Sequence, residues 1–181
     1  MKLRIDNDLM IEEFFADTRL LGIVAPIEQY RFCWHLNQML NFDFRINNNI
    51  EIQLNKKARK YFFPIYEYGE QSGTIKHYLY SNEDDGEFLL PEFKYLDFLW
   101  LIKDDIMHDA EVSLLTSSIR TIPAVQLITE LTNEKILGRR LGHQAGAPPS
   151  AILRMQNSPK AVPPAQAKFT SRKQASLLPS S

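Results

Sequence analysis

The chain is poor in cysteine, in glycine and in long apolar runs, and each scarcity excludes a class of site. Cys33 is the single cysteine among the 181 residues, which rules out an intramolecular disulfide and any CxxC metal or redox motif. Four glycines precede position 138, and none belongs to a phosphate-binding loop, a dinucleotide fingerprint or a nucleophile elbow. No run approaches the roughly 18 apolar residues of a membrane-spanning helix, and the N-terminus lacks the apolar stretch of a signal peptide. These absences predict a cytoplasmic protein without a recognisable catalytic motif.

Acidic residues are missing altogether from the last part of the chain. Positions 138–181 hold seven Lys and Arg and no Asp or Glu, whereas positions 1–137 hold 14 Lys and Arg and all 22 Asp and Glu. The last segment is also rich in proline, serine and alanine and shows no hydrophobic period. We therefore predict a single domain at 1–137 followed by a disordered basic tail at 138–181. Such a tail is suited to weak, non-specific contact with nucleic acid or to folding back on the acidic domain, and the sequence favours neither.

Residues 1–137 alternate between the hydrophobic periods of strands and of helices. One helix is predicted from Pro26 to Leu40, because proline is favoured at the first helical position, and a second from Asp109 to Ile119. A hairpin turn is predicted at Asp85-Gly86. Strands are predicted at 20–25, 50–54, 62–68, 74–80, 87–90, 95–103 and 122–131. This pattern predicts the α+β class, with a mostly antiparallel sheet and two or three helices packed on one face.

The first predicted helix carries a broad apolar face and a polar stripe. Cys33 is interpreted as a small core residue rather than a reactive thiol. Asn37 is expected to cap a nearby segment, and Arg31 to be solvated or to pair with an acidic side chain, with Glu92 or Asp97 as the specific alternative. The positions expected to form the apolar face are Ile27, Tyr30, Cys33, Trp34, Leu36 and Leu40.

Two carboxylates and a proline interrupt the most apolar part of the chain, within Leu90–Phe98. If 95–103 is a strand, Leu96 and Phe98 point to one side and Asp97 to the other. One interpretation is that Glu92 and Asp97 accept backbone N–H bonds where a proline breaks the strand pairing. A second makes both of them ligand-binding or acid–base carboxylates in a cleft, and a third places them at a surface that contacts a partner.

Two prolines bear on the order of the strands. Pro64 and Pro91 each lack the N–H that strand pairing requires. We therefore expect the strand around each proline to be an edge strand or to end there.

Two parts of the chain resemble the IPExxxVDY family, which is named after the motif Ile-Pro-Glu-x-x-x-Val-Asp-Tyr. Pro91, Glu92 and Asp97 match that motif, and Leu90, Leu96 and Phe98 are conservative replacements. The stretches Leu20–Ile23 and Tyr30–Asn37, the latter including Arg31, Cys33 and Trp34, are similar to a second block of the family. The resemblance covers most of residues 1–137. It implies a small cytoplasmic bacterial protein and carries over no activity, cofactor or catalytic residue.

No metal or cofactor is predicted. The densest group of potential ligands is Asp104, Asp105, His108, Asp109 and Glu111, and charge at a helix terminus explains these residues more simply.

We expect a non-enzymatic interaction or adaptor module, because catalytic motifs are missing and the predicted sheet is rich in aromatic residues. A protein partner, or a homodimer formed by pairing of an edge strand with its twin, fits this expectation. The alternatives are a small-ligand binder or enzyme that uses Glu92 and Asp97, and a nucleic-acid-associated protein that acts through the basic tail.

Overall fold

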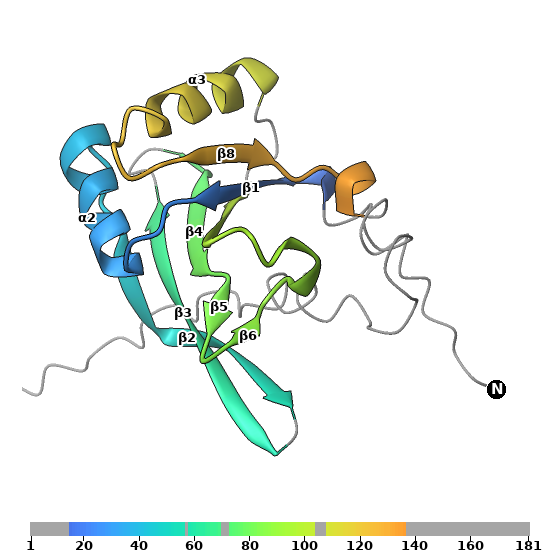
Figure 1. The fold of residues 1–181 in the computed structure, drawn as a ribbon. Helices are drawn as coiled ribbons and strands as arrows, with labels where there is room; N and C mark the ends of the chain where they lie inside the picture. Colours follow the sequence, from blue (N-terminus) through green and yellow to red (C-terminus); the bar gives the residue numbers. More distant parts are fainter. Residues whose placement is uncertain (1–14, 57, 70–72, 104–107, 137–181) are drawn as a thin grey trace, which may run out of the picture.

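The described part of the chain folds around one antiparallel sheet (Figure 1). The computed structural model describes residues 15–56, 58–69, 73–103 and 108–136. Among them, six strands lie in the order β2-β3-β4-β7-β1-β8, and every neighbouring pair is antiparallel. The α+β class is therefore confirmed, while the tail predicted at 138–181 lies outside the described residues. The bounds are β1 Thr18–Val24, β2 Arg45–Lys56, β3 Arg59–Gly69, β4 Lys76–Ser81, β7 Phe98–Lys103 and β8 Leu127–Glu130.

The position of β7 explains the most apolar run of the sequence. This strand lies between β4 and β1 in the interior of the sheet. Phe98, Trp100 and Ile102 join one hydrophobic cluster, whereas Leu99 and Leu101 join a second cluster on the opposite face. A strand that is covered on both faces needs apolar side chains at nearly every position. The continuous apolar run is the result.

Two helices cover one face of the sheet. These are α2 (Gln29–Leu40) and α3 (Asp109–Ile119), and Figure 1 shows α3 running along β8 with α2 at the adjacent corner. The prediction that helices pack on one face is confirmed, and the predicted bounds of the second helix match those of α3. The helix residues buried in this cluster are Phe32, Cys33 and Leu36 of α2 and Val112 and Ile119 of α3.

The opposite face is covered by an excursion of the chain between β4 and β7. The excursion forms a small hairpin, β5 (Glu83–Asp84) and β6 (Glu87–Phe88), and then a 3-10 turn, η1 (Pro91–Phe93). Four of its side chains are at most 3% exposed and pack against β7 and β1, namely Leu89, Leu90, Phe93 and Leu96. Complete burial of one such side chain is worth about 1.5–3 kcal/mol. The excursion is thus part of the core.

The hairpin turn predicted at Asp85-Gly86 is present. The φ angles are 46° for Asp85 and 78° for Gly86, and both lie in the left-handed region that a two-residue type I′ turn requires. Glu83 pairs with Phe88 on either side of the turn. This prediction is confirmed.

The first helix does not begin where proline predicted it. α2 begins at Gln29, and the extended residue Glu28 precedes it as the N-cap. Pro26 lies in the connection that leaves β1, where its fixed φ and missing N–H suit an extended turn.

Pro64 does not mark an edge strand, because β3 pairs with β2 on one side and with β4 on the other. The N–H of Phe62 donates to Asp84 Oδ2 at 2.9 Å and so points away from β2. Pro64 is two residues further along, so its nitrogen faces the same side. On that side the pairing with β4 begins only at Ile65. The missing N–H of Pro64 therefore costs no strand hydrogen bond.

Candidate functional site

The segment that carries the Pro-Glu motif is a compact turn and not the start of a strand. Pro91 occupies the first turn of η1, and β7 begins only at Phe98. Leu96 was predicted to share a face with Phe98, and this is wrong. Leu96 packs into the cluster on the opposite face, directly over Gly22 of β1, because a turn rather than a strand sets its direction.

Asp97 ties this turn to the end of β1. Its carboxylate oxygen Oδ2 accepts the backbone N–H of Ala25 at 2.7 Å. Its own N–H donates to the carbonyl oxygen of Ile23 at 2.9 Å, and its carbonyl oxygen accepts the N–H of Asn82 at 2.8 Å. The interpretation that Asp97 accepts a backbone N–H is therefore confirmed. The arrangement also brings together the two segments that carry the family resemblance.

Asn82 organises the motif from within, and sequence reasoning missed it. Asn82 is 0% exposed. Its side-chain nitrogen Nδ2 donates to the carbonyl oxygens of Phe93 and Leu96, both at 3.0 Å, and its Oδ1 accepts the N–H of Leu90 at 2.9 Å. Its carbonyl oxygen accepts the N–H of Leu89 at 2.8 Å. The only signal available was an asparagine placed just after an aromatic strand, where Asn commonly bonds to nearby backbone.

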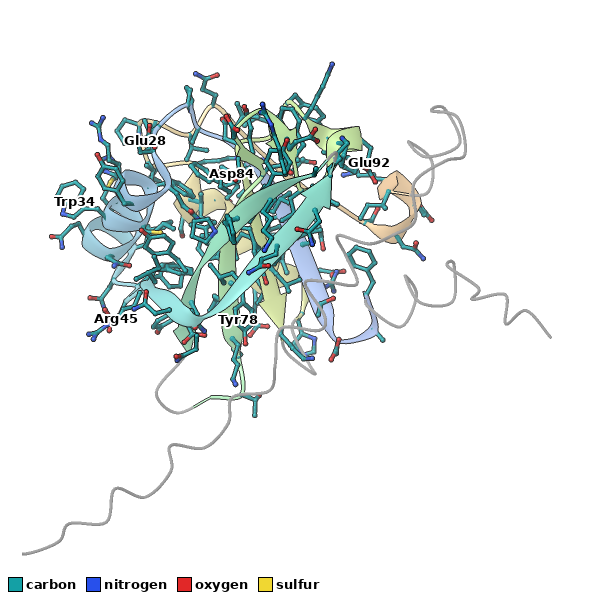
Figure 2. All side chains as sticks on the ribbon, turned by 90° about the horizontal axis from the view of Figure 1, so that it is seen from below. Glu28, Trp34, Arg45, Tyr78, Asp84 and Glu92 are labelled. Atoms are coloured by element: carbon teal, nitrogen blue, oxygen red, sulfur yellow. The ribbon has the colours of Figure 1, made fainter. Side chains whose placement is uncertain are left out.

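Glu92 differs from Asp97 in its surroundings. Glu92 is half-buried on η1, beside the exposed residues Lys94 and Tyr95. In Figure 2, Glu92 and Trp34 of α2 lie on opposite sides of the molecule. A backbone contact or a ligand-binding role for Glu92 stays a prediction.

Arg31 does not link α2 to the motif. It is exposed on the helix that covers the other face of the sheet. Within the described ranges, no ion pair joins Arg31 to Glu92 or Asp97. The alternative that Arg31 is solvated fits the structure.

The buried face of α2 differs from the predicted one. Tyr30 is 62% exposed and Trp34 is 58% exposed, so neither is a core residue. Phe32, which was not assigned to the apolar face, is fully buried and stacks on Phe98 with ring centroids 4.8 Å apart. With Phe32 buried, the 100° step between helix residues turns Tyr30 and Trp34 away from the sheet.

Polar side chains fix α2 to its neighbours. Asn37 Nδ2 donates to the carbonyl oxygen of Phe44 at 3.1 Å, and Asn37 Oδ1 accepts the Phe44 N–H at 2.8 Å. The prediction that Asn37 caps a nearby segment is confirmed. At the other end of the helix, Gln29 Nε2 donates to the carbonyl oxygen of Leu79 at 3.1 Å and lies 3.4 Å from that of Pro64.

Cys33 is a core residue, as predicted. Its side chain is buried on α2, and burial raises the pKa of the thiol from its ordinary value of 9.0 to about 12. A thiol with this pKa is protonated throughout the physiological range. The free thiolate that nucleophilic attack requires is therefore strongly disfavoured.

The raised pKa of Cys33 predicts a loss of stability in alkali. An unfolded thiol ionises near pH 9 and the folded one near pH 12, so this contribution is complete below pH 9 and is lost as the pH rises through that interval. Each pH unit above 9 costs about 1.4 kcal/mol. Between pH 8 and pH 10.5, the free energy of unfolding should fall by about 2 kcal/mol more in the wild type than in Cys33→Ala.

Urea denaturation at the two pH values measures this difference. Burial also raises the pKa of Tyr78, which remains in the variant, so its share cancels. The pKa of Tyr66 is raised by burial first and then by Cys33, so Cys33→Ala also removes the part due to Cys33, and this acts in the same direction as the expected difference. Equal losses in the wild type and in Cys33→Ala would contradict the prediction.

A group of five rings packs the connection between α2 and β2 against the sheet, and sequence reasoning did not assign it. Trp100 Nε1 donates to His77 Nδ1 at 3.2 Å inside this group. Because an indole nitrogen only donates, Nδ1 of His77 carries no proton in this arrangement. The rings lie 5.1–6.4 Å apart between centroids and belong to Phe42, Phe44, Tyr68, His77 and Trp100.

Potential metal ligands do not converge within the described ranges, where no group of three or more His, Cys, Asp or Glu side chains is placed to hold an ion. Asp104 and Asp105 lie outside those ranges. Glu111 accepts the backbone N–H of His108 at 2.9 Å, and Asp109 forms an ion pair with Arg19 at 2.7 Å. The contact of Glu111 with His108 is the helix-terminus role that the sequence suggested, whereas the ion pair of Asp109 with Arg19 of β1 was not predicted. Of the helices described, none is long and apolar enough to span a membrane.

Comparison with known proteins adds no assignment. No family model matches the chain, and no curated protein matches it. The IPExxxVDY resemblance therefore stays a prediction.

Proposed function

We propose that this chain is a non-enzymatic interaction module that docks a partner protein through the outward side of α2. The observation that carries the proposal is the exposure of Tyr30 and Trp34, at 62% and 58%, beside the exposed Arg31. Large exposed aromatic groups are unfavourable in water and become favourable when a partner covers them. Trp, Tyr and Arg are also the residue types that contribute most to binding energy at protein interfaces.

The anchoring of α2 supports this role. Phe32 holds one side of the helix to β7, Gln29 holds its first turn to β3 and β4, and Asn37 holds its last turns to Phe44. A helix that is fixed before binding loses little conformational entropy when a partner arrives. Figure 2 shows Trp34 pointing away from the body of the molecule, where a partner can reach it.

The contacts of Asp97 favour a structural role over a catalytic one for this residue of the Pro-Glu motif. Its carboxylate already accepts a backbone N–H, and the turn around it is closed by Asn82. A carboxylate that holds two segments of backbone together is poorly placed to move a proton or bind a ligand. We therefore propose a role in positioning the chain for Asp97.

The proposal predicts that capture of a partner depends on α2. The full chain is immobilised and exposed to a nuclease-treated extract of its native cells, which removes contacts through nucleic acid. We expect one protein to be retained stoichiometrically, and a Tyr30→Ser/Trp34→Ser variant to retain at least about tenfold less, as loss of two central aromatic residues implies.

A matched control is Leu114→Ser. Leu114 is 70% exposed on α3, so this change tests whether removal of any exposed apolar side chain lowers retention. This variant should retain the partner at the wild-type level. The proposal fails if the α2 variant and the wild type retain the same proteins in the same amounts.

A further inference from the structure

The helices leave part of their own side of the sheet uncovered. On β3, Phe63 and Ile65 are buried in the cluster opposite the helices, so the alternate residues Phe62 and Pro64 face the helix side. Phe62 is 42% exposed, and Pro64 is also exposed. Figure 1 shows the far end of the β2–β3 hairpin extending beyond the rest of the sheet.

A third apolar side chain continues this strip on β2. Ile46 pairs with Tyr66, which packs against the helix-side cluster, so Ile46 faces the same side. It is 48% exposed. The uncovered strip thus consists of Ile46, Phe62 and Pro64.

The exposed aromatic residues of α2 border this strip. Gln29 reaches the carbonyl oxygen of Pro64, and Asn37 bonds to Phe44 just before β2. Tyr30 follows the same flank of the helix as Asn37, and Trp34 lies one turn beyond Tyr30. The two exposed aromatic side chains of α2 and the exposed apolar side chains of the hairpin therefore lie on the same side of the sheet, and α2 adjoins the hairpin at Pro64. We call these five residues the α2–hairpin surface.

We infer that a second copy of this chain covers the α2–hairpin surface, so that Tyr30 and Trp34 of each copy pack on the apolar strip of the other. This inference rests on the proposed function, because it names the partner of the same side of α2. A two-fold symmetric interface needs one patch that is complementary to itself. Two neighbouring groups of exposed apolar side chains, one on α2 and one on the hairpin, meet that requirement when one copy is rotated by half a turn.

The area of this surface fits a dimer of modest affinity. A large side chain of this kind buries roughly 150–250 Å² when it is fully covered. Tyr30, Trp34, Ile46 and Phe62 are 42–62% exposed, which leaves roughly 400 Å² of apolar surface per copy to be covered. With a polar rim, the area buried on both copies together is about 1,200 Å², at the lower limit of stable interfaces. We therefore expect a dissociation constant in the micromolar range.

Pairing of an edge strand with its twin, the dimer mode expected from the sequence, is less favourable at β2, an outer strand of the described sheet. The register of β2 against β3 shifts between Ile46 and Glu51, and such an irregularity bends an edge away from further pairing. Lys56, which is 49% exposed, lies at the end of the same strand.

Sedimentation equilibrium of the full chain between about 1 and 500 µM tests the inference at the affinities expected for a small interface. We expect a monomer–dimer equilibrium, with dissociation constants at least about tenfold higher for Trp34→Ser and for Phe62→Ser, because each change acts twice in a symmetric dimer. Leu114→Ser is the matched control and should leave the equilibrium unchanged. The emission of exposed Trp34 should shift to shorter wavelength with concentration, while Trp100 is already buried.

Two results would overturn the inference. One is a monomer at all concentrations, and the other is a dimer that Trp34→Ser and Phe62→Ser do not weaken while both variants remain folded by circular dichroism. The proposed function fails separately. A monomeric chain that still captures a protein in a Trp34-dependent way keeps the interaction module and loses the second copy as its partner.

Discussion

Asn82→Asp is expected to lower the free energy of unfolding by about 3–5 kcal/mol. The change keeps the size of the side chain but removes both N–H donors of Nδ2, which serve the carbonyl oxygens of Phe93 and Leu96. A carboxylate oxygen would then face two carbonyl oxygens at a position that is 0% exposed. Repulsion and the cost of burying a charge without a cation act in the same direction.

The effect should extend over the whole Pro-Glu turn. The Asn82 side chain bonds to the backbone of Leu90, Phe93 and Leu96, and all three side chains belong to the core on this face. The bond from the Leu89 N–H to the main-chain carbonyl of Asn82 is left in place by the substitution. We expect unfolding at lower urea concentration, measured by the emission of Trp100, and faster hydrogen exchange at Leu90, whose N–H donates to the altered side chain.

Asn48→Asp is the matched control, because it makes the same chemical change at an exposed position of β2. It should alter the free energy of unfolding by less than about 0.5 kcal/mol. An Asn82→Asp protein that unfolds within about 1 kcal/mol of the wild type would show that the turn does not depend on this side chain.

The second large effect concerns the contact of Gly22 with Leu96. A Cβ atom added at Gly22 would overlap the Cδ1 atom of Leu96, and Leu96 is 1% exposed, so its side chain has to shift within the core. Gly22→Ala should therefore cost about 1–3 kcal/mol through overpacking. Leu96→Ala should cost about 2–5 kcal/mol through the cavity that it leaves.

The double variant Gly22→Ala/Leu96→Ala tests whether the two residues contact each other directly or lower the free energy of unfolding independently. When the methyl group introduced by Gly22→Ala enters the space left by Leu96→Ala, the combined cost should be smaller than the sum by at least about 1 kcal/mol. Gly69→Ala serves as the control, because nothing lies within 4 Å of a Cβ built there. Strictly additive costs for Gly22→Ala and Leu96→Ala would argue against direct packing of the two residues.

Sequence patterns correctly predicted the elements that are determined by residues close together in the chain. α3 was placed correctly because Val112 and Ile119 repeat at helical spacing, and acidic residues occupy its first turn. The Asp85-Gly86 turn was placed correctly because two consecutive left-handed residues have a strong sequence preference. Neither prediction required knowledge of what the element packs against.

Predictions that depended on a partner in space were less successful. Both Phe32 and Trp34 are apolar, and the choice between them is made by Phe98, which lies far along the chain and stacks on Phe32. The direction of Leu96 is likewise set by Asn82, whose bonds turn the chain before β7 begins. Asp97 was interpreted correctly in kind, as a backbone acceptor, but its partner Ala25 was not identified.

The order of the strands also determines when the fold can form. β1 is the first described strand, yet its two neighbours are the last two, β7 and β8. As the chain leaves the ribosome, β1 has no neighbour until β7 has emerged, and its second side stays open until Glu130 has followed. The sheet therefore closes late in synthesis, and pairing across such long separations slows folding. Until then the apolar residues Leu20, Leu21 and Ile23, which are buried in the folded chain, are exposed on the nascent chain and accessible to holdase chaperones.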